Sequence, residues 1–282
     1  MARAAAHIGE SSSVRWLVAR LARREGRSAV RRALATMGAP ALDALLSTLA
    51  RRDGDRLLRA QIPATLAGFA SRQAADALFS TLASDRDGLV RFRCLRALEG
   101  LVHARVAAFS AAHVRPIAHR ALSEHFRLLA LRAATTPSPE GGRVEPAAAQ
   151  RVLDALLDEK ARQALMRAYL TIGLAFPADD LRRAFEAATG DDAAARSAAV
   201  ELVDALLVPR RGRRRHDELR DWLRLAVDPL PVAERAARAG AATSPERARA
   251  ALLADPDPIV QALARELAAV AAGAPGPEHA LG

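Results

Sequence analysis

Apolar residues recur at helical spacing along most of this 282-residue chain. Two such stripes are Leu45, Leu46, Leu49 and Leu58, Ile62, Leu66, Phe69. Spacings of three and four residues place apolar side chains on one face of an α-helix. Ala, Leu and Arg, which favour helices, dominate the composition, whereas runs of β-branched residues are scarce. The pattern therefore predicts an all-α chain of short amphipathic helices.

The apolar pattern is also repeated. The heptapeptide DALLSTL (43–49) returns almost unchanged as DALFSTL (76–82), 33 residues later. Residues 57–69 likewise align with 89–101 at an offset of 32. Periods of 20 to 50 residues are typical of solenoids and other repeat arrays. A lone helical hairpin cannot bury both of its stripes, but the next hairpin covers them. We therefore expect three stacked hairpins across residues 13–101.

An Asp opens the second helix of each of two predicted hairpins. Asp55 precedes Arg59 by four residues, and Asp87 precedes Arg91 by four. An Asp at this position caps free backbone N–H groups and favours the positive end of the helix. At i,i+4 spacing it can also pair with the Arg. The pattern predicts capping, and a charge ladder that links successive hairpins is an addition it leaves open.

These hairpins resemble a known repeat family. The segment DGLVRFRCLRALEGL (87–101) and the tail LLADPDPIVQALARELAAV (252–270) are similar to HEAT repeats. In the tail, Pro258 follows Asp257 at the first helical position, where proline is favourable. The resemblance implies a right-handed α-solenoid of HEAT-like helical hairpins, which is an armadillo-type fold.

A narrower resemblance covers most of residues 5–260. Residues 59–82, 87–101 and 156–207 look like the cytoplasmic HEAT region that follows the membrane part of certain bacterial transporters. Those transporters are similar to ATP/ADP translocases of the major facilitator class. Their membrane half has no counterpart in this chain, so no transport residue can be carried over. The resemblance implies an accessory or regulatory cytoplasmic module.

The domain organisation follows from where the pattern is regular. We expect regular HEAT-like repeats at 1–105, with a first unit that opens partway through a hairpin, and helices with interruptions at 106–134. A flexible loop at 135–146 is predicted from its Pro, Gly and Ser content. Further hairpins at 147–272 end in a HEAT-like unit, and a disordered tail is predicted at 273–282.

The charge balance permits anionic partners without selecting one. The formal net charge is +10 and the isoelectric point is about 11.2. The densest basic run comprises Arg210, Arg211, Arg213, Arg214 and Arg215. These guanidinium groups could hold phosphates, and the simpler interpretation is a solvated loop between helices.

Residues for chemistry are few. Cys94 is the single cysteine, so an intrachain disulfide is impossible and a buried apolar role is expected. His113, His119 and His125 with Glu124 are the best metal-like group, but spacings of six place successive histidines on different sides of a helix. We find no phosphate-cradling or nucleophile motif. The sequence therefore predicts no catalytic residue, no cofactor and no metal.

The function predicted from these observations is recognition. We expect a non-catalytic HEAT-repeat scaffold that binds another protein, with a membrane transporter as one candidate partner. The alternative is a basic HEAT-like nucleic-acid-binding protein, similar to the alkylpurine DNA glycosylases. The first residues lack the apolar core of a signal peptide, and no apolar run approaches the roughly 18 residues of a bilayer span. A cytoplasmic location is expected, and contact with the inner face of the membrane is compatible with it.

Overall fold

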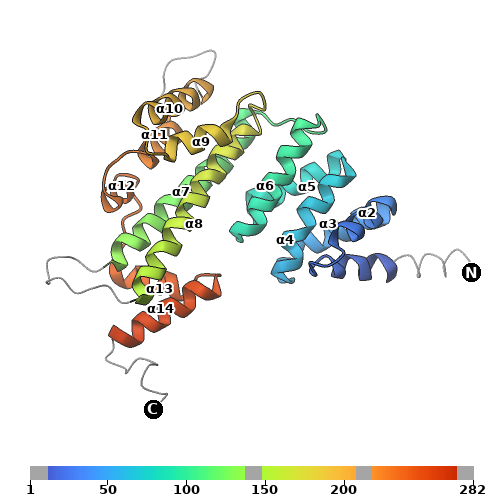
Figure 1. The fold of residues 1–282 in the computed structure, drawn as a ribbon, viewed down its shortest axis with the longest axis horizontal. Coiled ribbons are helices and arrows are strands. Elements are labelled where there is room, and N and C mark those ends of the chain that lie inside the picture. Colours follow the sequence, from blue (N-terminus) through green and yellow to red (C-terminus); the bar gives the residue numbers. More distant parts are fainter. Residues whose placement is uncertain (1–11, 137–147, 208–216, 272–282) are drawn as a thin grey trace, which may run out of the picture. The chain divides into compact units, whose positions relative to one another are not determined.

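The helices that the apolar stripes predict are present in the structure. It is a computed structural model in which residues 12–136, 148–207 and 217–271 are described. Every regular element in these ranges is helical (Figure 1), so the all-α prediction is confirmed for this part of the chain. The chain divides into two compact units: Met1–Ile117 with Leu170–Asp180, and Ala118–Tyr169 with Leu181–Gly282. Each unit is described by itself.

Unit 1 is built from paired helices. Residues 12–20 are helical, and then come α2 (Arg27–Thr36), α3 (Ala39–Ala50), α4 (Arg56–Leu66), the short 3₁₀ helix η1 (Ala67–Phe69), α5 (Arg72–Ser84) and α6 (Gly88–His103). Helices α3 and α4 form one hairpin, and α5 and α6 form the next (Figure 1). Helix α4 packs against both α2 and α6, while α3 packs against α5. First helices thus contact first helices, and second helices contact second helices.

The core of unit 1 is made by the repeated apolar positions. Leu45 and Leu49 of the first heptapeptide are buried, and so are their counterparts Leu78 and Leu82 in the second. Each of these side chains contributes about 1.5–3 kcal/mol by leaving water. The heptapeptide recurs because the same packing contact recurs.

Unit 2 includes the longer helices. Its elements are α7 (Ala111–Thr135) and α8 (Ala148–Gly173), each of which also extends into unit 1, then α9 (Leu181–Thr189), α10 (Ala193–Leu207), α11 (Glu218–Ala226), α12 (Val232–Arg238), α13 (Pro245–Leu253) and α14 (Pro258–Ala271). Within this unit α9 packs on α10, α10 on α11, and α13 on α14. The last pair lies at the red end of the ribbon in Figure 1.

The stretch 106–134 begins with a break and continues as a long helix. Residues 106–110 are not helical, and α7 then runs without interruption for 25 residues. Pro116 is the sixth residue of α7 and lacks the N–H that would reach the carbonyl of Ala112, yet the helix continues through it. Helix α8 ends at Gly173.

Some predictions fall outside the described residues. These are the partial first hairpin before residue 12, most of the 135–146 loop and the 273–282 tail. Among the described residues, no helix combines the length and the apolar character that crossing a membrane requires.

Candidate functional site

Asp55 and Asp87 stand at the N-termini of second helices. Asp55 accepts hydrogen bonds from the backbone N–H groups of Leu57 and Leu58, at 2.7 and 3.3 Å. Asp87 accepts equivalent bonds from Leu89 and Val90, at 2.8 and 3.3 Å. Both carboxylates therefore cap their helices in the way the sequence predicts.

The sequence left open an i,i+4 pair between each cap Asp and its Arg, and the structure gives Arg59 and Asp87 other partners. Arg59 forms its ion pair with Asp85, in the turn before α6, and both side chains are only 5% exposed. Asp87 pairs with Arg56. Arg91 is buried in α6.

Arg59, four positions after the cap Asp55, also bonds the preceding helix of the hairpin. Arg59 donates to the carbonyl of Leu49, in the last turn of α3, through Nε at 3.4 Å and through a terminal nitrogen at 3.3 Å. Carbonyls in the last turn of a helix have no intrahelical donor, and an Arg side chain can supply one. We call the N-cap Asp together with the Arg or Gln four residues later the hairpin clamp.

Unit 2 contains two further copies of the hairpin clamp, and the Arg or Gln contact of each was not predicted from the sequence. Asp192 caps α10 through Ala194 and Ala195, and Arg196 donates to the carbonyl of Gly190 at 2.9 Å. Asp257 caps α14, and Gln261 donates to the carbonyl of Asp255 at 2.7 Å. The signal was present in the sequence, because DAAAR and DPIVQ repeat the spacing of DRLLR and DGLVR.

A buried Asp extends two of these clamps. Asp85 and Asp255 each stand two residues before a cap, and each accepts a hydrogen bond from the cap residue's own N–H, at 2.8 and 2.9 Å. Each also receives a cation from another helix: Arg59 reaches Asp85, and Lys160 of α8 lies 3.1 Å from Asp255. In the first hairpin the equivalent Asp53 is exposed.

The histidines have separate local partners. His113 lies 3.1 Å from the hydroxyl of Ser110, and His119 stacks on Trp222 with ring centroids 4.4 Å apart. His125 is buried and bonds the carbonyl of Ala161 at 2.9 Å. In the described ranges, no three His, Cys, Asp or Glu side chains are grouped to hold a metal ion.

The structure describes Cys94 but not the basic run. Cys94 is fully buried in α6, and burial raises the pKa of its thiol. The basic run Arg210, Arg211, Arg213, Arg214 and Arg215 lies in residues 208–216, which are outside the described ranges.

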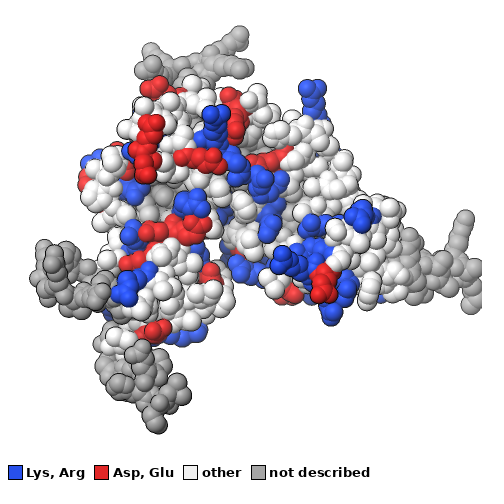
Figure 2. Space-filling model, viewed as in Figure 1, with Lys and Arg blue, Asp and Glu red and all other residues white. Residues whose placement is uncertain are grey.

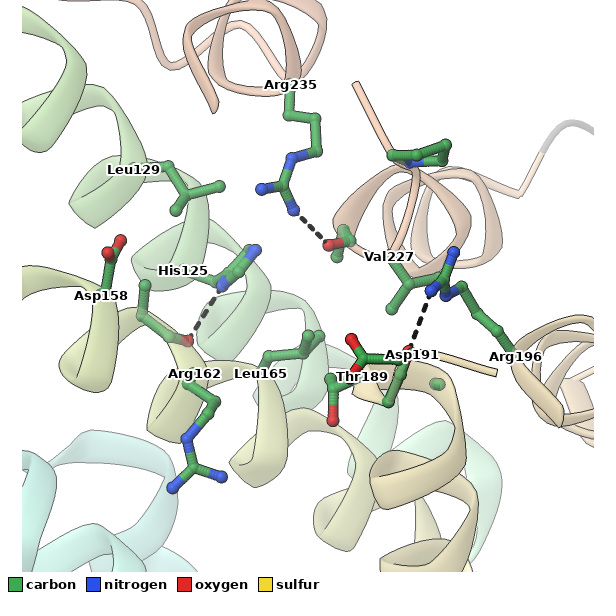
Figure 3. A pocket seen from close by; sticks show the side chains of 15 residues that line it. His125, Leu129, Asp158, Arg162, Leu165, Thr189, Asp191, Arg196, Val227 and Arg235 are labelled. Atoms are coloured by element: carbon green, nitrogen blue, oxygen red, sulfur yellow. Dashed lines mark hydrogen bonds between the residues drawn. The ribbon is translucent and has the colours of Figure 1, made fainter. Parts of the chain in front are cut away.

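Unit 2 contains a pocket of about 390 Å³ that the sequence did not indicate (Figure 3). Its lining comes from α7, α8, α9, α10, α11 and α12, and from the α9–α10 and α11–α12 turns. Leu129 and Leu165 form an apolar wall of the pocket. Arg196 and Arg235 extend into the pocket from two other sides (Figure 3). Because these residues are far apart in the sequence, no local motif could reveal the pocket.

The pocket encloses a neutral imidazole. The carbonyl of Ala161 can only accept, so Nδ1 of His125 donates to it and Nε2 is left as an acceptor. Nε2 has no hydrogen-bond partner among the residues that the structure describes. Burial is the main cause that lowers the pKa of His125 to about 4, and the charge of Arg235 lowers it further. His125 is therefore uncharged at neutral pH.

Comparison of the chain with protein-family models, with curated proteins and with solved structures finds no match. The HEAT resemblance therefore rests on the repeated residues and on the helical hairpins described above.

Proposed function

We propose that this chain is a non-catalytic scaffold of HEAT-like hairpins that binds another protein. The observation that carries the proposal is the hairpin clamp. In three hairpins the Arg or Gln side chain donates to a carbonyl at the end of the preceding helix or in the turn, and the Asp caps the second helix in these and in the Asp87 hairpin. The most repeated polar residues of the chain thus have an architectural role, and recurrence is what an extended binding surface requires.

The packing of unit 1 supports a solenoid arrangement. Second helices α2, α4 and α6 are neighbours in one layer, and first helices α3 and α5 are neighbours in another. Stacked two-helix repeats have this pattern of contacts. The ion pairs Arg59–Asp85 and Arg56–Asp87 tie one hairpin to the next. They are the inter-hairpin ladder that the sequence left open, made with other partners.

Exposed apolar side chains support protein binding. Leu57 and Ile259 each stand two residues after a cap Asp, and they are 62% and 60% exposed. The equivalent Leu89 is half-buried. An aliphatic side chain that leaves water in a complex contributes about 1.5–3 kcal/mol. By the transporter resemblance, the partner class is a membrane transport protein, and the chain is its cytoplasmic accessory module.

The alternative, a nucleic-acid-binding protein similar to the alkylpurine DNA glycosylases, is supported by the formal charge of +10. On the face that Figure 2 shows, however, basic and acidic side chains are interleaved and do not form one continuous basic stripe. A basic stripe or patch is the usual electrostatic footprint of such proteins. We therefore favour the scaffold.

The test is to place a photo-crosslinking amino acid at position 57 or 259 of the full chain and to identify the covalent adducts formed in cells. Glu266, which is exposed on α14, is the matched control position. We expect one protein to be captured at 57 or 259 and not at 266. With that protein purified, Leu57→Asp or Ile259→Asp should weaken binding about tenfold or more, and Glu266→Ala should not.

Binding to duplex DNA separates the two functions. Sub-micromolar affinity that survives about 150 mM salt, where non-specific binding is far weaker, would favour the alternative. If the chain binds DNA in this way and no protein is captured at position 57 or 259, the scaffold proposal is wrong.

A further inference from the structure

We propose that the pocket in unit 2 binds a small organic anion, whose charged group lies between Arg196 and Arg235 and whose apolar body contacts Leu129 and Leu165. Small-molecule sites commonly combine apolar walls with a few convergent polar groups in about 300–1,000 Å³, and this pocket lies within that range. The proposal is independent of the scaffold function.

Both guanidinium groups are held in place by a backbone carbonyl. Arg196 donates to Gly190 at 2.9 Å, and Arg235 donates to Ala226 at 2.7 Å. Each of these bonds uses one of the five N–H donors of the group and fixes its direction. Figure 3 shows both side chains reaching towards the centre of the pocket, whereas Arg162 points away from them. Arg162 is paired with Glu159 at 2.9 Å.

Neither anchored Arg forms an ion pair with a carboxylate of the described residues. The two acidic residues of the lining do not change this, because Asp158 lies 2.9 Å from Arg132 and Asp191 is exposed. Asp228 and Asp158 act on Arg235 only through their fields. The pocket therefore contains two oriented positive groups that are not paired with a carboxylate of the described residues.

Arg235 also has a buried hydrogen-bond donor that is not satisfied. Its Nε–H is buried and has no hydrogen-bond partner. Burial lowers the pKa of this guanidinium, which means that its charged form is poorly solvated. An anionic oxygen would satisfy the donor and compensate the charge together, and the planar fork of Arg suits carboxylate or phosphate.

His125 gives the site a neutral acceptor beside this cation. Nε2 of His125 is buried without a partner, and Arg235 lies close enough for its charge to act on the imidazole. Both unsatisfied atoms are covered by protein, so we expect the side chain of Arg235 to shift when a ligand enters. A shift of Arg235 changes the environment of the His125 ring, which makes the ring a reporter of occupancy.

The experiment uses the full chain at pH 7.5 and about 150 mM NaCl, with benzoate and phenyl phosphate as probes of the two head groups. Benzyl alcohol is the neutral analogue and inorganic phosphate is the anion without an apolar body. Two-dimensional NMR should show saturable shifts at Thr189, Gly190 and the His125 ring for one or both aromatic anions. Calorimetry then gives the affinity.

The variants separate a built site from surface attraction. Arg235→Gln and Arg196→Gln should each weaken binding about tenfold or more, as expected for a lost charge-assisted hydrogen bond. Arg238→Gln is the matched control, because Arg238 is an exposed residue of the same helix and is paired with Glu234. It should change the affinity less than twofold.

Three results would overturn the proposal. They are equal loss in the Arg238→Gln control, benzyl alcohol binding as tightly as benzoate, and no saturable shift at the pocket in the unmodified chain. The last result decides the matter even if Arg235→Gln fails to fold.

Discussion

The substitution Asp85→Ala tests the tie between successive hairpins in unit 1. It removes the carboxylate that faces Arg59. Both side chains are only 5% exposed, so the guanidinium of Arg59 stays buried without that carboxylate. Breaking a buried pair by deleting one partner costs about 3–5 kcal/mol, because an uncompensated charge is left behind. Arg59 keeps its bonds to the carbonyl of Leu49. We therefore expect the lower end, about 3 kcal/mol.

The assay is chemical denaturation followed by circular dichroism, with Asp53→Ala as the matched control. Asp53 stands at the equivalent place before the first clamp, with 79% of its side chain exposed and only a 3.8 Å contact to Arg51. Its loss should cost less than about 0.5 kcal/mol. The double variant Arg59→Met, Asp85→Ala should be more stable than Asp85→Ala alone, since the orphaned charge is gone.

The two substitutions give a sharp comparison. If Asp85→Ala lowers the free energy of unfolding no more than Asp53→Ala does, the buried ion pair does not stabilise the junction between the hairpins.

Four further outcomes are expected. Lys160→Met should destabilise unit 2 by about 1–3 kcal/mol in denaturant melts, because it leaves the carboxylates of Asp255 and Asp257 without their shared cation, 3.1 Å from each; an unchanged midpoint would contradict this. Asp192→Ala should cost about 1 kcal/mol and Asp192→Ser much less, since only capping is lost; equal losses would exclude the cap. His125 should destabilise the fold as pH falls from about 6.5 to about 4, because burial lowers its folded pKa and the unfolded chain takes up the proton first. The pH dependence of unfolding in this window should therefore be shallower in His125→Gln, and an identical slope would refute it. Cys94 should react with iodoacetamide only as fast as unit 1 opens, because it is buried and burial raises the pKa of its thiol; rapid labelling of the native chain would contradict its placement.

Local pattern predicted the helices well. Helices α10, α13 and α14 lie within the 147–272 range where further helices are expected. Asp55 and Asp87 cap their helices because capping depends only on the next three residues. The right-handed solenoid and the HEAT class remain predictions.

Longer-range contacts could not be predicted from the sequence. The partner of Arg59 is 26 residues away, in the turn of the next hairpin, and i,i+4 spacing gave no hint of it. Lys160 finds its two carboxylates 95 and 97 residues later. The pocket joins side chains of α7, α8, α10 and α12, each of which has an ordinary local sequence. Such groupings depend on how helices pack, and that is decided by the whole core.

The order in which the two compact units use the chain matters for synthesis on the ribosome. Unit 1 contains Leu170–Asp180, which is translated only after the Ala118–Tyr169 part of unit 2. This segment includes Thr171 and Ile172, both fully buried. A nascent chain that stops before residue 180 therefore lacks part of the interior of its first unit. Vectorial folding of the hairpins can begin early, but it cannot finish until this late segment has emerged.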